Sequence, residues 1–528
     1  MALSQDSVSY NYSMALFPFK PPVFRVSSCA SKSMVTEYFQ ERTRQQPENP
    51  YAAMIPDQEI AIIPSFTLES GVTLNNVPLA YTTRGKLSAN RDNAMVICHA
   101  LTGSADVSDW WGPLLGGPGR AFDTSRFFII CLNSLGSPYG TASPVTAKDG
   151  DPSKERYGPE FPLTTVRDDV KLHKMLLDDL AVRQVATVIG GSMGGMLVLE
   201  WAYFGKDYVR SIVPIATSSR HSAWGISWGE AQRQSIYADP KYDDGYYSFE
   251  DPPVTGLGAA RMSALLMYRS RNSFEARFGR NIPDPARHQT IREKPRPSTP
   301  SEAHFHIHND GHTVTRTNLS RTSSGSLQQV KVTKEADDSS TDPSAKVEVN
   351  SLDPQFSRPK QPVESLTGGD SVPTTTYFSA QSYLRYQGQK FVKRFDGNCY
   401  IAITRKLDTH DVSRYRADTI AEALALIEQP TLVLGIESDG LFTFAEQQEL
   451  AQHIKNARLC EIVSQEGHDA FLLQFEQVNR HILDFLTEVL PDIMLKEGEA
   501  AAEVEAGVGQ ITKSSVFGEA EVEDITAW

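Results

Sequence analysis

A serine, an aspartate and a histidine stand where a nucleophilic catalyst needs them. Ser192 lies in the sequence Gly-Gly-Ser-Met-Gly at positions 190–194, which matches the G-x-S-x-G motif. In this motif a sharp turn from strand to helix lifts the serine Oγ above the edge of a sheet. The flanking glycines are needed because a Cβ there would collide with neighbouring backbone. Since strand-like and helix-like patterns flank the turn, Ser192 is the predicted nucleophile.

His468 and Asp439 are the predicted base and acid that activate this serine. A serine hydroxyl is a weak nucleophile until a base takes its proton. Where the motif starts a helix after a strand, its partners follow in the order Ser, Asp, His, each in a loop after a later strand. Asp439 and His468 each follow an apolar run in that order. Glu437 is the alternative acid, although its placement fits less well.

Acyl transfer also requires donors for a tetrahedral oxyanion. The backbone N–H of Met193, directly after the nucleophile, is one predicted donor. The second is expected from the loop His-Ala-Leu-Thr-Gly at 99–103, which follows an early apolar run. Leu101 is the first choice for this donor and Thr102 the second.

The spacing of apolar residues predicts an α/β fold with a mostly parallel sheet. Short continuous apolar runs, typical of strands buried on both faces, occupy 94–98, 127–132, 185–189, 212–216, 431–436 and 459–463. Helical spacing is found at 165–180, 196–203, 444–454 and 475–490. Strands alternating with helices favour a doubly wound arrangement with helices on both faces of the sheet. Segments 65–69 and 77–82 are expected to open the domain as antiparallel strands.

Composition divides the chain into a folded part and segments expected to stay unfolded. We assign 1–54 to an N-terminal extension, 55–220 to the first part of the core, 221–427 to a helical cap, 428–494 to the second part of the core, and 495–528 to a disordered tail. Helices are expected in the cap at 259–278 and 377–395. Between them, residues 281–376 are rich in Ser, Thr, Pro, Asp and Lys with two aromatics, too few to offset the entropy of ordering. The sheet domain is thus interrupted by a cap, and the cap by a low-complexity insert.

Charge, cysteine usage and hydropathy exclude several classes of protein. The net charge of −14 is opposite to what a general nucleic-acid binder needs. The five cysteines are scattered without a CxxC pair, so neither a disulfide framework nor a zinc ribbon is indicated. No apolar run is long enough to predict a membrane span. The histidines between 304 and 312 lie in the insert, so we expect no metal site there.

The N-terminus allows two interpretations. Residues 1–36 hold one acidic residue, three basic residues and eight serines, a balance similar to that of a transit peptide. The sequence Phe-Pro-Phe-Lys-Pro-Pro at 17–22 would break an amphipathic helix, which favours a disordered extension. We expect a cytoplasmic protein, with mitochondrial targeting left open.

Several motifs together resemble fungal homoserine O-acetyltransferases. They are Phe-Thr-Leu-Glu-Ser-Gly at 66–71, Cys-His-Ala-Leu-Thr-Gly at 98–103, Trp-Trp-Gly-Pro at 110–113, Asn-Ser-Leu-Gly-Ser-Pro-Tyr-Gly at 133–140, the serine motif with Met196, and Gly-His-Asp-Ala-Phe at 467–471. The likeness spans about 60–280 and 377–490. It implies an α/β-hydrolase fold with a helical cap and a ping-pong reaction through Ser192. Acetyl-CoA would be the co-substrate and L-homoserine the acceptor, in methionine biosynthesis.

The resemblance also implies two substrate-binding residues. Asp469, next to the predicted base, matches the family carboxylate that meets the substrate ammonium group. Arg233, in Ala-Gln-Arg-Gln at 231–234, matches the arginine that pairs with the substrate carboxylate. No metal and no cofactor other than the acetyl-CoA co-substrate is implied. Family members are often dimers through the cap, so a homodimer is one option for this chain.

Three alternative functions remain open on the sequence. The acceptor could be another hydroxyl compound, such as L-serine or deacetylcephalosporin C. The same triad could serve an esterase that uses water as acceptor, because exclusion of water, and not spacing, separates the two activities. The fold could also be a scaffold without catalysis, which the intact Ser192, Asp439 and His468 argue against.

Overall fold

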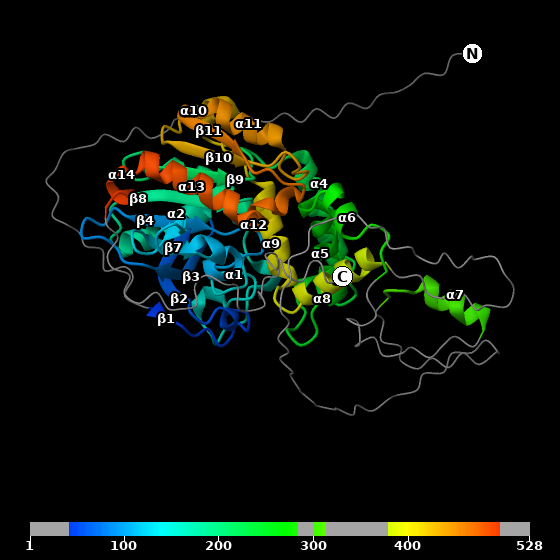
Figure 1. Ribbon diagram of the computed structural model, residues 1–528. Coiled ribbons are helices and arrows are strands. Elements are labelled where there is room, and N and C mark those ends of the chain that lie inside the picture. Colours follow the sequence, from blue (N-terminus) through cyan, green and yellow to red (C-terminus); the bar gives the residue numbers. More distant parts are fainter. Residues whose placement is uncertain (1–41, 283–298, 313–377, 497–528) are drawn as a thin grey trace, which may run out of the picture. The chain divides into compact units, whose positions relative to one another are not determined.

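A mixed sheet of nine strands forms the centre of the protein. The computed structural model describes residues 42–282, 299–312 and 378–496. Within them the strand order is β1-β2-β3-β7-β4-β8-β9-β10-β11 (Figure 1). The strands are β1 (Arg42–Thr43), β2 (Glu59–Thr67), β3 (Thr73–Arg84), β4 (Ala94–Cys98), β7 (Phe128–Leu132), β8 (Val185–Gly191), β9 (Ile212–Ile215), β10 (Thr431–Gly435) and β11 (Ala457–Glu461). Strands β5 (Leu115–Gly116) and β6 (Phe122–Asp123) form a small separate pair.

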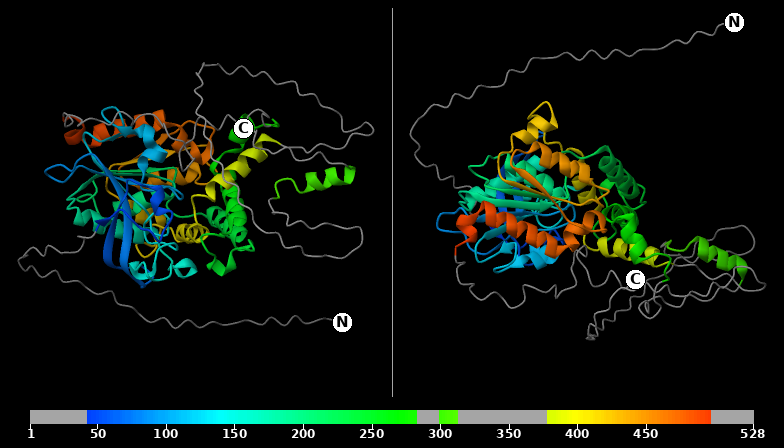
Figure 2. Two further views of the ribbon diagram at one scale, coloured as in Figure 1. Left: turned by 90° about the horizontal axis from the view of Figure 1, so that it is seen from below. Right: turned by 45° about the horizontal axis from the view of Figure 1, so that its top comes forward.

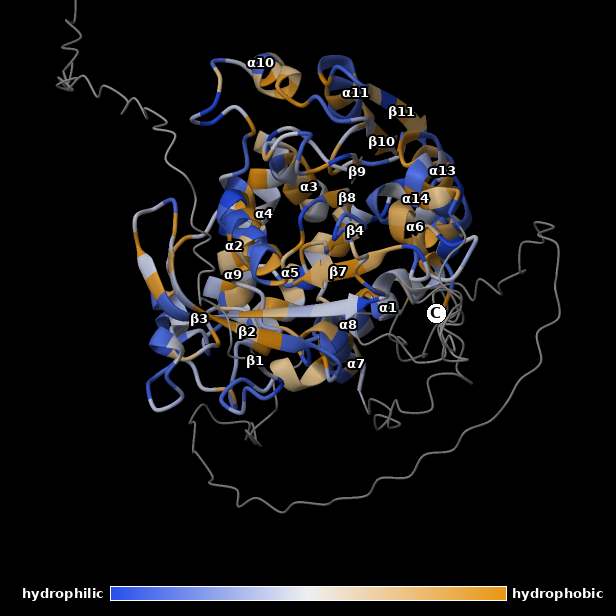
Figure 3. Cartoon of the chain, turned by 90° about the vertical axis from the view of Figure 1, so that its left-hand side faces the viewer, coloured by the Kyte–Doolittle hydropathy of each residue, from blue (hydrophilic) through white to orange (hydrophobic). Residues whose placement is uncertain are grey.

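The direction of the strands confirms the predicted fold class. Strands β7, β4, β8, β9, β10 and β11 run parallel, whereas β1, β2 and β3 are antiparallel at one edge. Every residue of β4, β8, β9 and β10 is buried, which explains their unbroken apolar runs. The hydrophobic colour in Figure 3 is accordingly concentrated on the strands in the middle of the sheet.

Helices cover both faces of this sheet (Figure 2). Side chains of α2 and α3 pack in the core on one face, and those of α1 and α13 in the core on the other. The helices are α1 (Val107–Trp111), α2 (Val166–Asp179), α3 (Met193–Ala202), α4 (Ala223–Tyr237), α5 (Val254–Tyr268), α6 (Arg271–Arg277), α7 (Pro300–His308), α8 (Ser379–Phe391), α9 (Gly397–Asp408), α10 (Ile420–Ala425), α11 (Phe444–His453), α12 (Ala470–Leu473), α13 (Phe475–Val489) and α14 (Pro491–Met494). Across the described part of the chain, no helix combines the length and the apolar character that crossing a bilayer demands.

Helix α2 shows how local sequence sets an element and ties it to its neighbours. The Thr165 side chain accepts from the Asp168 N–H while the Asp168 carboxylate accepts from the Thr165 N–H, a capping box. Asp168 also accepts a 2.8 Å hydrogen bond from the Glu69 N–H, in the loop between β2 and β3. The start of α2 is therefore anchored to the antiparallel edge of the sheet.

Helices α4, α5, α6, α8 and α9 lie between β9 and β10 in sequence and gather at one side of the sheet (Figure 1). Helix α5 packs on α4 and α8, and α4 on α9. The prediction of one helix over 259–278 is wrong, because α5 ends at Tyr268 and α6 begins at Arg271. Arg269 is extended, and the Ser270 side chain caps α6 by accepting from the Ser273 N–H. Arg269 and Ser270 at this break contact the loop that carries His468.

Two segments expected to be unstructured contain ordered residues. Residues 42–54, assigned to the disordered extension, include β1, which pairs with β2, and a short 3-10 helix. Asn49 is buried there and donates to the Pro138 carbonyl at 2.8 Å. In the insert, Thr299 caps α7, and Asp310 after that helix forms an ion pair with Arg385 of α8 at 3.0 Å. These local contacts correct the prediction for 42–54 and 299–312, while the remaining residues of the extension, insert and tail lie outside the described residues.

A fully buried ion pair joins the cap to the sheet domain. The Lys406 ammonium on α9 lies 2.5 Å from an Asp169 carboxylate oxygen on α2, and both side chains are inaccessible to solvent. Lys406 also donates to the Leu135 carbonyl, and Asp169 accepts from the Leu135 N–H at 2.8 Å. Burial raises the pKa of Asp169 to about 6, although Lys406 opposes this shift. A buried pair with its hydrogen bonds satisfied is costly to break.

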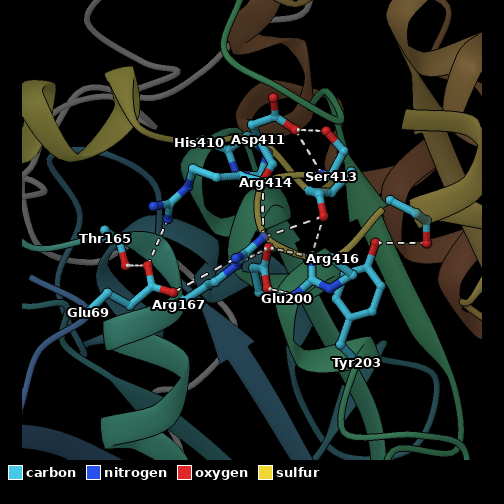
Figure 4. A network of polar contacts seen from close by, with 12 residues as sticks. Glu69, Thr165, Arg167, Glu200, Tyr203, His410, Asp411, Ser413, Arg414 and Arg416 are labelled. Atoms are coloured by element: carbon cyan, nitrogen blue, oxygen red, sulfur yellow. Dashed lines mark hydrogen bonds and ion pairs between the residues drawn. The ribbon is translucent and has the colours of Figure 1, made fainter. Parts of the chain in front are cut away.

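The chain that returns from the cap to β10 is held by a network of charged side chains (Figure 4). The Glu200 carboxylate on α3 forms two ion pairs: Oε2 lies 2.6 Å from Arg416 Nη2, and Oε1 lies 3.3 Å from Arg167 Nε. Glu69 Oε2 forms an ion pair with Arg414 Nη2 at 2.7 Å. Because Glu200 is nearly inaccessible to solvent, these pairs are less screened than ordinary surface ion pairs. The return segment is thus fastened to α2, to α3 and to the loop between β2 and β3.

A buried histidine on α2 should make stability depend on pH. Burial lowers the pKa of His173 to about 3, and an unfolded histidine titrates near 6.5. The unfolded state therefore binds the proton first, so the stability that this group contributes is complete above about pH 6.5 and is lost as the pH falls toward 3. Between pH 7 and pH 5 we expect the wild type to lose about 2 kcal/mol more unfolding free energy than His173→Gln. Urea titrations of both proteins at the two pH values measure this, and equal losses would refute the assignment.

Candidate active site

Ser192 stands at the turn between β8 and α3 in a strained backbone conformation. Its φ of 59° and ψ of −126° are unusual for a residue other than glycine. The turn is held from the next strand, because the Ser192 N–H donates to the Ile215 carbonyl and Thr217 donates to the Ser192 carbonyl at 2.8 Å. The surrounding structure thus maintains a strained nucleophile position at the carboxyl end of the sheet.

Both glycines of the motif are required by close packing. A Cβ on Gly190 would lie 2.6 Å from the Gly194 carbonyl oxygen, and a Cβ on Gly194 would lie 2.2 Å from the Cys98 carbonyl oxygen. These distances are too short for any side chain, so the motif allows α3 to approach β4 and β8 closely.

His468 and Asp439 form a hydrogen-bonded pair after the two strands that follow the cap. His468 Nδ1 lies 2.7 Å from Asp439 Oδ2, and both side chains are buried. The other oxygen, Oδ1, accepts from the N–H groups of Leu441 and Phe442 at 2.8 and 3.0 Å. With Asp439 held in this way, His468 carries its proton on Nδ1 and presents Nε2 as the basic nitrogen. Glu437, the alternative acid, is exposed.

Ser192 and His468 line the same cavity, which has an empty volume of about 680 Å³. The His468 ring lies among three aromatic rings, with centroid separations of 5.4 Å to Phe442, 5.4 Å to Phe471 and 6.1 Å to Tyr268. Ser192 is only 8% exposed. Ser192 and His468, the predicted nucleophile and base, are therefore both largely buried side chains in the lining of one cavity.

The predicted oxyanion donors flank this serine. Leu101 lines the cavity, and Met193 begins α3 directly after the nucleophile. Among the residues that the structure describes, neither N–H donates to another group, so both remain available to a ligand. His99 supports the loop, since Nε2 accepts from the Ser134 N–H at 3.0 Å and Nδ1 then donates to the Ala100 carbonyl at 2.7 Å.

Arg233, predicted to bind the substrate carboxylate, lies behind the cavity wall. It is 1% exposed and is paired with Asp408 at 2.9 Å and Glu230 at 2.8 Å. Its Nη1 has no hydrogen-bond partner among the described residues and would be 3.2 Å from a Cβ on Gly229, which lines the cavity. A buried donor without a partner is costly unless a ligand completes it. Arg233 thus has one nitrogen available next to the cavity, although two carboxylates already bind the rest of its guanidinium.

Asp469, predicted to meet the ammonium group, lines the cavity directly. It is 4% exposed, and its Oδ2 forms an ion pair with Arg269 Nε at 2.9 Å. The sequence did not point to Arg269. Nothing in a single sequence shows that the break between α5 and α6 contacts the loop at 465–469, which carries His468 and is called the base loop below.

His221 is a cavity-lining residue that the sequence analysis did not single out. Burial, together with the charges of His410 and Arg233, lowers its pKa to about 4, so the ring is neutral at physiological pH. Its Nδ1 is buried without a hydrogen-bond partner among the described residues. The cavity lining thus contains the neutral imidazole of His221 as well as His468.

Other histidines take no part in this arrangement. His173 and His410 are buried and contact the carbonyls of Asn133 and Ser218, respectively. In the described ranges no group of three or more His, Cys, Asp or Glu side chains could hold a metal ion, and this includes the histidines of α7. The chemistry available at the site is that of a serine nucleophile, a His–Asp pair and two backbone donors.

The parallel sheet, the strained serine turn and the order of the triad define the α/β-hydrolase class. A sequence profile described as alpha/beta hydrolase fold matches residues 93–307. The structure is similar to esterase E22 (TM-score 0.58, 21% identity, 81% of this chain and 99% of that chain) and to homoserine O-acetyltransferase from Bacillus anthracis (TM-score 0.58, 19% identity, 84% and 98%). At these identities the likeness shows the fold.

Sequence relatives are much closer. The chain is 66% identical to homoserine O-acetyltransferase of Emericella nidulans, over 92% of this chain and 98% of the relative. It is 60% identical to that of Ascobolus immersus (92% and 97%) and 54% identical to that of Saccharomyces cerevisiae (91% and 96%). The protein belongs to the homoserine O-acetyltransferase family, an enzyme family of acyltransferases.

Proposed function

We propose that the protein transfers an acetyl group from acetyl-CoA to the hydroxyl group of L-homoserine. The observation that carries this proposal is the cavity lined by Ser192, His468 and Asp469, with the unpartnered nitrogen of Arg233 behind its wall. Membership of the family supports the choice of acceptor. The triad supplies the chemistry, so the proposal needs no cofactor besides the acetyl-CoA co-substrate.

In the first half-reaction Ser192 attacks the thioester carbonyl. His468 Nε2 accepts the hydroxyl proton, and Asp439 stabilises the imidazolium that forms. The N–H groups of Leu101 and Met193 would bind the oxyanion of the tetrahedral intermediate. Collapse expels the CoA thiolate, which takes the proton from His468, and leaves an acetyl ester on Ser192.

In the second half-reaction the acceptor hydroxyl attacks this ester while His468 again serves as base. An L-homoserine molecule carries one carboxylate and one ammonium group, and the cavity offers one partner for each. Arg233 Nη1 would donate to the carboxylate, and Asp469 would accept from the ammonium group. Both groups are nearly inaccessible to solvent, so a substrate lacking either charge would lose one of these two contacts in a poorly solvated site.

Transfer requires that water does not reach the acetyl ester first. Ser192, Asp439 and His468 are all less than one-tenth exposed, and aromatic rings enclose the base. These features favour transfer over the hydrolysis expected of an esterase. The free cysteines Cys98, Cys131, Cys399 and Cys460 are compatible with the reducing cytoplasm, which is our proposed location.

An acceptor panel tests the proposal. Purified protein is mixed with acetyl-CoA and either L-homoserine, L-serine, deacetylcephalosporin C or no acceptor, and free thiol is followed. We expect thiol release that depends on L-homoserine, with parallel double-reciprocal plots for the two substrates because the mechanism is ping-pong. Release at the same rate without an acceptor would identify an esterase, and preference for another hydroxyl compound would replace homoserine as the substrate.

A further inference from the structure

The base loop at 465–469 packs against the break between cap helices α5 and α6. Gly467 has a φ of +74°, and a Cβ on it would lie 2.5 Å from the Ser270 backbone nitrogen. The Ser270 hydroxyl donates to the Gln465 carbonyl. The loop that carries His468 is therefore formed against the cap and not only by the sheet.

Arg269 occupies the centre of this contact. Its Nε lies 2.9 Å from Asp469 Oδ2 and its Nη1 lies 2.8 Å from Glu466 Oε2. The side chains of Arg269 and Asp469 are 5% and 6% exposed. Burial opposes the charge of Arg269, but the two carboxylates outweigh it and raise the pKa of the guanidinium above its ordinary value. One guanidinium thus bridges two carboxylates of the base loop.

The two carboxylates depend on Arg269 to different degrees. Glu466 also receives Arg277 Nη2 at 2.7 Å and the Ser273 hydroxyl at 2.6 Å, both from α6. Burial would raise the pKa of Glu466, yet these hydrogen bonds and the nearby arginine charges hold it below its ordinary value. Without the Arg269 guanidinium, Glu466 would still be tied to α6 by Arg277 and Ser273, whereas Asp469 would lose the ion pair that joins it to the break between α5 and α6.

Arg269 itself does not line the cavity, although Tyr268 and Asp469 on either side of the contact do. It can therefore act on a bound substrate only through Asp469. Before the substrate binds, a nearly buried carboxylate that will later meet an ammonium group needs another positive partner, because an unpaired charge in this environment is costly. Arg269 meets this need through its Nε, 2.9 Å from Asp469 Oδ2, which places a positive charge on the side of the carboxylate facing α5 and α6.

We propose that Arg269 is a positioning residue for recognition of the acceptor: it keeps Asp469 oriented toward the cavity for the ammonium group of the amino-acid substrate. The inference rests on the proposed function and deepens it. Arg269 takes no part in forming the acetyl-enzyme, so its loss affects the second half-reaction alone. Selectivity for an amino acid over a simple alcohol thus depends on a cap residue outside the cavity.

The test separates the two half-reactions and the two acceptors. The variants are Arg269→Met, Arg269→Lys and, as matched control, Arg277→Met, which removes a guanidinium from Glu466 only. Stopped-flow release of CoA in the absence of acceptor reports on acetylation of Ser192. Steady-state transfer is measured with L-homoserine and with 4-hydroxybutanoate, which is homoserine without the ammonium group.

For Arg269→Met we expect the KM for L-homoserine to rise by about 10- to 100-fold. The CoA burst rate and the transfer to 4-hydroxybutanoate should stay within about twofold of the wild type. Arg269→Lys should recover part of the loss, and Arg277→Met should retain the wild-type KM. In an Asp469→Asn background, Arg269→Met should have no further effect on KM.

Equal losses with both acceptors, or a slower CoA burst in a variant with unchanged melting temperature, would show that Arg269 only holds the base loop and would overturn the inference. If Arg269→Met does not fold, the comparison of Arg269→Lys with wild type in the Asp469 and Asp469→Asn backgrounds gives the same decision. A wild-type protein that releases CoA but does not acetylate homoserine would overturn the proposed function, and with it this inference.

Discussion

Replacing Ser192 with alanine should abolish homoserine-dependent release of CoA, with a loss in kcat on the order of 10⁵-fold or more. The proposed mechanism needs a covalent acetyl ester at this position, and Ser192 is the hydroxyl residue at the strained turn between β8 and α3. Donors for the oxyanion would remain, but a site without a nucleophile cannot form the acetyl-enzyme. Thiol release and mass spectrometry of the intact protein after acetyl-CoA addition measure the two consequences.

Ser211→Ala provides a matched control for this experiment. Ser211 is also a buried serine of the same sheet, immediately before β9, and its hydroxyl donates to the Ala186 carbonyl at 2.9 Å. Its loss should lower stability by about 1 kcal/mol and leave kcat unchanged. A Ser192→Ala protein that still takes up an acetyl group, or turns over at more than a trace of the wild-type rate, would contradict the assigned nucleophile.

Asp439→Asn should lower kcat by about 10³- to 10⁴-fold with little change in fold. Oδ1 of Asp439 accepts two backbone N–H groups, so the oxygen of an asparagine would take that place and its NH₂ would face His468. The His468 Nδ1 would then have to accept a hydrogen bond, which moves the ring proton to Nε2, the nitrogen that must receive the serine proton. The steady-state rate with saturating acetyl-CoA and homoserine measures the effect.

Glu437→Gln is the corresponding control, because Glu437 is the neighbouring acid that could have served instead. It is exposed, so the substitution should leave kcat within about twofold of the wild type. If Glu437→Gln were the damaging change and Asp439→Asn the harmless one, the acid of the triad would have to be reassigned.

The sheet and the turn that carries Ser192 could be predicted from the sequence because their signals are local. Strands buried on both faces require continuous apolar runs, and β4, β8 and β9 lie within about two residues of the predicted positions. The turn at Ser192 requires glycines at set positions, whatever lies elsewhere in the chain. The sequence also placed Asp439 and His468 after β10 and β11, and the structure brings them within hydrogen-bond distance.

The cap could be predicted less well, because its structure depends on contacts between distant segments. Helix α4 contains Gly225 and Gly229, which weaken its helical signal, and it is stabilised by packing on α5 and α9. The break at Arg269 and Ser270 exists because the base loop packs there, at a residue nearly two hundred positions further along the chain. Likewise, the pairing of Arg233 with Asp408 could not be inferred from either residue alone.

The predicted end of the N-terminal extension, at residue 54, was wrong for a similar reason. Residues 42–54 have little apolar content of their own, and they are ordered by pairing with β2 and by the buried contact of Asn49 with Pro138. Composition indicates whether a segment can form a hydrophobic core of its own. It does not indicate whether the segment can be ordered by packing on a core formed by the rest of the chain.

The buried Lys406–Asp169 pair has a consequence for the catalytic cycle. Swinging α9 away from α2 would leave two full charges without partners in an apolar environment, at a cost of several kcal/mol. We therefore expect α9, whose Thr404 and Leu407 line the cavity, to stay in place against α2 during turnover. On the proposed function, both substrates therefore have to reach Ser192 past a fixed wall that Thr404 and Leu407 of α9 help to form.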